Sequence, residues 1–168
     1  MASATIDRVS EDSVDFALVA YREEGAWQVQ PLPNRVAAAD LDGLVRALRP
    51  WPSESGSLGL VSIDEDFFLL VRVQGRDVRM LLSDVTAAAD WPLAASVLTS
   101  LDLPEPDDDE DPQPAGQMDI VADLGVSAMD LALLCDDPEL YPDEVLSDIS
   151  HRMGFGTEFE GALEGAPV

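Results

Sequence analysis

The segment "LGLVSIDEDFFLLVRVQGRDVRMLLSD", Leu58 to Asp84, restricts the fold more than any other part of the chain. Two short polar turns, at residues 64–66 and 75–76, divide it into three apolar runs with the composition of strands. Because side chains alternate between the two faces of a strand, these turns place apolar residues alone on one shared face. That face consists of Val61, Ile63, Phe67, Leu69, Val71, Val73, Val78, Met80 and Leu82. We predict that it is the core side of an antiparallel sheet.

The opposite face of these three strands is mixed, because it carries two arginines among apolar side chains and a serine. The predicted register places Arg72 and Arg79 directly opposite each other. Two like charges in such a pair are unfavourable unless a carboxylate lies between them. Two interpretations stay open: neighbouring acidic residues neutralise the pair, or the two arginines form an anion-binding site.

The flanking segments add two more strands and two helices. The stretch "DFALVAYREEGAWQVQPL" is typical of a hairpin, with Glu23, Glu24 and Gly25 as its loop and Tyr21 paired with Trp27. The stretches "ADLDGLVRALRP" and "DWPLAASVLTSLD" carry apolar residues at helical spacing. This order predicts an α+β domain over residues 13–103, in which packed helices cover an antiparallel sheet of about five strands. We expect residues 1–12 to be disordered.

An acidic, proline-rich stretch, "LPEPDDDEDPQP", follows at Leu103 to Pro114. Its prolines and its like charges both favour extended chain, so we predict a linker over residues 104–117. A calcium loop starting at Asp107 would need Gly and Glu where the chain has Pro112 and Met118, so no metal site is expected.

The linker's own carboxylates are candidate partner contacts. They are Asp107, Asp108, Asp109, Glu110 and Asp111. An extended chain spaces such charges by ~3.3 Å, which is similar to the phosphate spacing along one nucleic-acid strand. The linker is therefore either a mobile tether or a mimic of nucleic acid, and its composition favours the tether.

A two-helix unit is predicted over residues 118–156. Its first helix begins with the capping pattern Ser127-x-x-Asp130. We expect its buried stripe to contain Met129 and Leu134, with either Leu133 or Leu131 between them.

The second helix lies in "YPDEVLSDISHRMGFG", with Pro142 in its first turn, His151 in its last turn and Gly154 at its end. Because about 40 residues make a thin core, we expect the unit to dock on the α+β domain or on a partner. Residues 157–168 are expected to form a flexible tail.

The charge of the chain is strongly segregated. Nine arginines and no lysines stand against 34 acidic residues, and residues 84–168 contain 21 of the acids but a single arginine. Such a surface is repelled by phosphates and anionic membranes and attracted to basic proteins, so we predict binding to neither nucleic acid nor membranes. Solubility and the codon usage of a high-G+C genome are an alternative source of most of this charge. The chain has no export signal or spanning segment, and a cytoplasmic location is expected.

Residues with the spacing of a known catalytic or cofactor site are missing from the sequence. A zinc nucleobase deaminase needs H-x-E and P-C-x-x-C, whereas His151 is followed by Arg152 and Met153, and Cys135 is the single cysteine. We therefore predict no metal, no cofactor and no enzyme. A hydrolase that uses paired carboxylates would have to draw on Asp64, Glu65, Asp66, Asp136, Asp137 and Glu139.

Four parts of the chain together resemble a known family. They are "DFALVAYREEGAWQV", "LGLVSIDEDFFLLVRV", the acidic proline-rich break and "DLGVSAMDLALLCDDPELYPDEVLSDISHRMGFG", of which the last is the most specific. The chain is similar through most of its length to the tRNA adenosine deaminase-associated proteins of high-G+C actinobacteria. The resemblance implies an association with that deaminase and supplies no catalytic residues.

These observations lead to one main hypothesis and two alternatives. The main hypothesis is a non-catalytic, acidic interaction or regulatory protein that binds tRNA adenosine deaminase or another basic RNA-handling protein. The first alternative is a small-molecule or anion-binding sensor that uses Arg72 and Arg79 on the sheet face. The second, less favoured, is the carboxylate-dependent hydrolase.

Overall fold

A computed structural model of the chain describes residues 14–51, 56–107 and 109–165. The predicted disorder of residues 1–12 lies outside the described residues. Within these ranges the chain contains no helix that is both long and apolar enough to span a bilayer.

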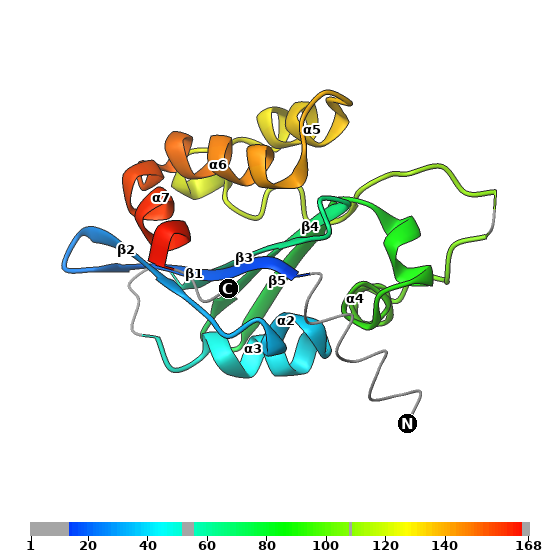
Figure 1. Cartoon of the computed structure of the whole chain (residues 1–168), viewed down its shortest axis with the longest axis horizontal. Coiled ribbons are helices and arrows are strands. Elements are labelled where there is room, and N and C mark those ends of the chain that lie inside the picture. The colour runs from blue at the N-terminus through cyan, green and yellow to red at the C-terminus, as the bar shows by residue number, and fades with distance from the viewer. Residues whose placement is uncertain (1–13, 52–55, 108, 166–168) are drawn as a thin grey trace.

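A six-stranded antiparallel sheet forms the centre of the molecule, with the strand order β2-β1-β3-β4-β5-β6 (Figure 1). The strands are β1 (Val14–Glu23), β2 (Ala26–Pro31), β3 (Ser57–Ile63), β4 (Phe67–Gln74), β5 (Asp77–Leu82) and β6 (Ala115–Gly116). The α+β class is confirmed, with one strand more than the five expected. The extra strand, β6, lies inside the predicted linker and pairs with the end of β5.

The register of β3, β4 and β5 agrees with the alternation of the sequence. Ile63 pairs with Phe67, Val71 with Met80 and, on the other face, Arg72 with Arg79. All nine residues of the predicted apolar face belong to or pack against one buried cluster.

The predicted register of the first hairpin is wrong by one residue. Arg22 pairs with Trp27, and only Glu24 and Gly25 form the loop, both with positive φ (55° and 80°). A two-residue loop with two left-handed residues matches the twist of the strands that it joins, which the three-residue loop does less well. As a consequence Tyr21 and Trp27 lie on opposite faces, and the ring of Tyr21 lies tilted against that of Trp51, with 5.2 Å between the ring centroids.

The first face of the sheet is covered by the helices that precede the acidic linker. They are α2 (Arg35–Ala38), α3 (Leu41–Leu48), the 3-10 helix η1 (Val85–Ala89) and α4 (Pro92–Ser100). Figure 1 shows α2, α3 and α4 together below the sheet. Asp40 caps α3, since its Oδ1 accepts a hydrogen bond from the Gly43 amide at 3.0 Å.

The second face is covered by the C-terminal part of the chain. It contains the 3-10 helix η2 (Ala122–Leu124), α5 (Ala128–Asp136), α6 (Pro142–Met153) and α7 (Gly156–Gly165). Figure 1 places α5, α6 and α7 above the sheet, opposite α2, α3 and α4. All seven residues of β3 are buried because both faces of the strand are covered. We call the segment 118–165, on this second face, the C-terminal layer.

The expectation of a flexible tail from residue 157 is wrong for residues 157–165, which belong to helix α7. Phe159 is 1% exposed and its ring meets Phe16 of β1 edge to face at 5.7 Å. The apolar residues of α7 are few, so its sequence alone has the composition of a tail. Phe159 anchors the helix, because its side chain is buried in the apolar cluster between the sheet and the C-terminal layer.

We predict that Phe159→Ala lowers the free energy of unfolding by about 3–5 kcal/mol, the usual cost of deleting a buried phenyl ring. Urea denaturation of the two proteins measures this difference. Thr157→Ala, an exposed change in the same helix, serves as the control and should have little effect. Equal stability of Phe159→Ala and the wild type would contradict the docking of α7.

Candidate partner-binding groove

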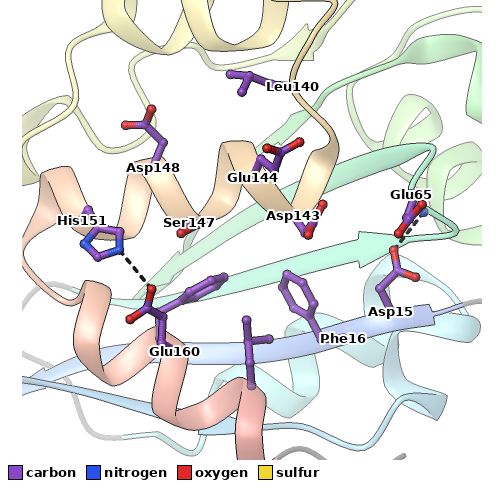
Figure 2. A pocket seen from close by; sticks show the side chains of 12 residues that line it. Asp15, Phe16, Glu65, Leu140, Asp143, Glu144, Ser147, Asp148, His151 and Glu160 are labelled. Atoms are coloured by element: carbon purple, nitrogen blue, oxygen red, sulfur yellow. Dashed lines mark hydrogen bonds and ion pairs between the residues drawn. The ribbon is translucent and has the colours of Figure 1, made fainter.

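A groove with a volume of about 710 Å³ lies between α6, α7, strand β1 and the turn that joins β3 to β4 (Figure 2). Acidic side chains line it above an apolar floor. Its lining consists of Asp15, Phe16, Glu65, Leu140, Asp143, Glu144, Ser147, Asp148, His151, Phe159, Glu160 and Leu163. We call this feature the acidic groove.

The floor of the acidic groove is built by the contact that docks α7. Phe16 points from β1 and Phe159 from α7, and their rings are perpendicular within 8°, at an interplanar angle of 82°. Leu140 and Leu163, both partly buried, extend the apolar lining. Such a floor can take the hydrocarbon stem of a long side chain.

Hydrogen bonds fix the acidic residues at one end of the groove. Asp15 Oδ2 accepts from Ser62 Oγ and from the Glu65 amide, each at 2.9 Å. The second bond holds a turn in which Asp64 and Glu65 have positive φ (54° and 50°), a conformation that non-glycine residues rarely adopt. The turn in this conformation brings Glu65 to the rim of the groove.

Helix α6 supplies the other rim. Glu144 accepts a hydrogen bond from the Tyr141 amide at 3.0 Å and so completes the N-terminal cap of α6. Asp143, in the same first turn, is favoured there by the helix dipole. Asp143 and Glu144 therefore line the groove and also stabilise the N-terminus of α6.

Few cations neutralise these carboxylates. Asp148 pairs with Arg152 at 2.6 Å, and Glu160 faces His151 at 3.5 Å. In the described part of the chain, no arginine forms an ion pair with any of the four remaining acids, which are Asp15, Glu65, Asp143 and Glu144. The groove thus presents an uncompensated negative potential, which attracts cationic groups from outside.

The carboxylates proposed for a hydrolase do not share a substrate-sized pocket. Asp64, Glu65 and Asp66 lie on an exposed turn, and Asp136, Asp137 and Glu139 are exposed as well. Asp66 and Asp137 do line one hollow together, but its volume of about 160 Å³ is below that of most ligand sites. Burial, and then the charges of Asp84, Asp64 and Asp90, raise the pKa of Asp66.

The other groups considered for catalysis or metal binding are the Cys135 thiol and clusters of metal-ligating side chains. Burial, with a smaller effect from Asp136, raises the pKa of the Cys135 thiol to about 11, so it is protonated and weakly nucleophilic at neutral pH. Within the described ranges, no three His, Cys, Asp or Glu side chains are grouped closely enough to hold a metal ion. The six acids of the groove are suited to binding cationic groups.

The structure provides Arg72 with a carboxylate from its own chain. Its side chain is 1% exposed, and its two terminal nitrogens donate to Asp123 Oδ1 and Oδ2 at 2.6 and 2.9 Å. It also donates to the Ile120 carbonyl at 2.9 Å. The hydrogen bond from Arg72 holds the pKa of Asp123 below its ordinary value. This geometry supports neutralisation of the arginine pair, one of the two interpretations that the sequence left open.

The acidic linker is apart from the groove. Asp107, Asp109, Glu110 and Asp111 are exposed, whereas Asp108 lies outside the described residues. Glu110 accepts hydrogen bonds from the Asp107 amide and from Gln113, each at 3.2 Å. None of these four acids lines the acidic groove.

Sequence reasoning did not find the groove or Asp123. Of the six acids that line the groove, only Glu65 was a candidate site residue. Each of the other five looks like an ordinary surface residue on its own strand or helix. The one available signal was the paired arginines, which require a nearby carboxylate. The sequence offers many acids for that role and does not indicate which of them reaches Arg72.

The chain matches known proteins over nearly all of its length. Residues 15–156 match the family model described as Rv3753c-like tRNA adenosine deaminase-associated protein. Protein Rv3753c of Mycobacterium tuberculosis is 34% identical over 165 residues, which is 96% of this chain and 95% of that protein. No solved structure matches the chain significantly.

We predict that Asp123→Asn lowers the free energy of unfolding by about 1–3 kcal/mol at pH 7, because a buried guanidinium loses its charged partner. The lowered pKa of Asp123 means that this stabilisation is present above its ordinary value of 3.8 and is lost as the pH falls below it. The difference between variant and wild type should therefore shrink below that pH. Urea denaturation at pH 7 and pH ~3 measures it, with exposed Asp119→Asn as the control.

Proposed function

Since the chain belongs to the family of Rv3753c-like tRNA adenosine deaminase-associated proteins, we propose that it is a non-catalytic binding partner of tRNA adenosine deaminase. The observation that carries this proposal is the acidic groove, in which four carboxylates above an aromatic floor form no ion pair with any of the described residues. In this proposal the groove receives a basic segment of the deaminase.

The expected charge of the partner supports this proposal. An enzyme that acts on tRNA must present basic side chains to the phosphates of its substrate. The C-terminal layer contains twelve acidic residues and one arginine, so it complements such a surface and would compete with RNA for it. Binding in this way gives the protein a regulatory role, in which it occupies or flanks the deaminase's tRNA site in the cytoplasm.

The lining of the groove fits arginine or lysine in particular. The hydrocarbon stem of either side chain can pack on Phe16 and Phe159, while its charged end reaches carboxylates on both rims. A guanidinium can also stack on a ring or bind a carboxylate with two hydrogen bonds. The groove therefore offers both halves of such a side chain a complementary surface.

We predict that the triple variant Glu65→Gln, Asp143→Asn and Glu160→Gln weakens binding to the deaminase about 10- to 100-fold at ~50 mM salt. The estimate assumes three charge contacts of about 0.5–1 kcal/mol each. Because these contacts are screened, the difference should shrink at ~500 mM salt. Calorimetric titration of the purified proteins measures both effects.

The matched control removes three exposed charges that do not line the groove, through Glu23→Gln, Asp42→Asn and Asp77→Asn. It leaves the same net charge as the groove variant and should bind like the wild type. An equal loss in both variants would mean that only total charge matters. Absence of wild-type binding at ~50 mM salt would refute the association as a direct contact.

For the acidic linker we propose a tether, which leads to a separate prediction. Replacing residues 107–111 by a Gly/Ser segment of equal length should leave both the melting temperature and the affinity for the deaminase nearly unchanged, because an exposed tether contributes no direct contact. Thermal denaturation and the same titration test this. If affinity falls, the linker acids are recognised directly and the mimicry interpretation is the correct one.

A further inference from the structure

Helix α5 exposes two large apolar side chains on its outer side. Met129 is 75% and Leu133 is 65% exposed, more than any other large apolar side chain in the described part of the chain. They are four residues apart and therefore neighbours on one helix face. We call this pair the α5 patch.

The α5 patch is not needed to hold the helix in place. Leu131 and Leu134 are the buried residues of α5 and pack in the cluster beneath the C-terminal layer. The expectation that Met129 is part of the buried stripe is therefore wrong. Helix α5 therefore has a second apolar face that no other part of the described chain buries. An exposed apolar face of this kind is typical of a surface that binds a partner.

Acidic residues flank the patch along helix α5. Asp136, three positions after Leu133, continues the same face, and Asp130 and Asp137 lie close by in the sequence. Among the described residues, Arg152 is the one arginine in an ion pair with α5, to Asp130 at 3.7 Å, and it is also bonded to Asp148 at 2.6 Å. The rim of the patch thus carries net negative charge.

Charge decides between the possible occupants. A second copy of this chain, with a net charge of −25, would bring acids against acids, and an anionic lipid surface would be repelled in the same way. A helix with an apolar stripe and flanking Arg or Lys would cover the patch and neutralise its rim. Met and Leu suit such a contact, since both adapt to the shape of a partner helix.

We propose that the α5 patch docks an amphipathic, basic helix of the partner protein. This inference rests on the proposed function for the identity of the partner, and extends it by adding an apolar contact outside the acidic groove. No residue of α5 lines that groove, so the two surfaces can be changed independently.

The test titrates the full chain with two synthetic peptides at ~150 mM salt. One is an 18-residue helix of Leu and Lys with its Leu residues at helical spacing, and the other has every Leu replaced by Ala. The wild type should bind the Leu peptide at least about 10-fold more tightly, as expected from burial of a few large apolar side chains. The double variant Met129→Ser, Leu133→Ser should lose this preference.

Two controls make the comparison specific. Leu103→Ser removes another exposed leucine, 43% exposed and outside α5, and should keep the preference for the Leu peptide. All replaced side chains are exposed, so the variants should retain the melting temperature of the wild type. If the double variant melts at a lower temperature, the single variant Leu133→Ser is compared with Leu103→Ser instead. An unchanged preference in the α5 variant would overturn the proposal.

The remaining outcomes separate this inference from the proposed function. If the deaminase does not bind the wild type but the α5-dependent preference is found, the proposed function fails and the docking surface stands. If the deaminase binds wild type and double variant equally, the inference alone fails. A wild-type dimer in sedimentation velocity that the double variant abolishes would identify a second copy as the occupant and overturn the proposal.

Discussion

A buried arginine on one face of the sheet determines how the second half of the chain must fold. A guanidinium that is removed from water is tolerated only with charged and polar partners around it, and Arg72 finds them in Asp123 and the Ile120 carbonyl. Both partners belong to the short segment between β6 and α5. Their position over the sheet fixes where the C-terminal layer begins, and α6 and α7 continue it as far as β1 (Figure 1). The acidic groove exists because the layer ends there, with Phe159 on Phe16.

The two sides of the C-terminal layer differ in role, because its inner side stabilises the fold and its outer side carries the charge on which the proposed binding depends. The C-terminal layer holds twelve acids that repel one another, and this repulsion is offset by apolar side chains such as Val145, Leu146 and Ile149 beneath them. The outward surface is consequently free to remain acidic. In the function that we propose, this outward charge attracts the basic surface of a protein that binds RNA.

Patterns within a short segment were predictable from the sequence, and contacts between distant segments were not. Alternation predicted the pairing of Arg72 with Arg79, and the capping residue Ser127 predicted the start of α5. The hairpin loop was wrong because Glu24 adopts positive φ, which a preference for glycine does not reveal. Helix α7 was missed because Phe159 is buried by Phe16, near the other end of the chain. Met129 was assigned to the core because periodicity shows that a face is apolar and does not show whether it is covered.

The proposed complex needs two kinds of contact because each alone would be insufficient. Charge complementarity speeds encounter and orients the partner, yet an acidic groove by itself attracts many basic proteins with little discrimination. An apolar contact adds little to the rate of encounter, but it must be broken before the partner leaves, so it lengthens the life of the complex. Discrimination then requires a partner whose basic segment and amphipathic helix reach both surfaces at once. The acidic groove and the α5 patch are separate surfaces. Their separation would make binding specific, because a basic protein that matches the groove alone would bind only weakly.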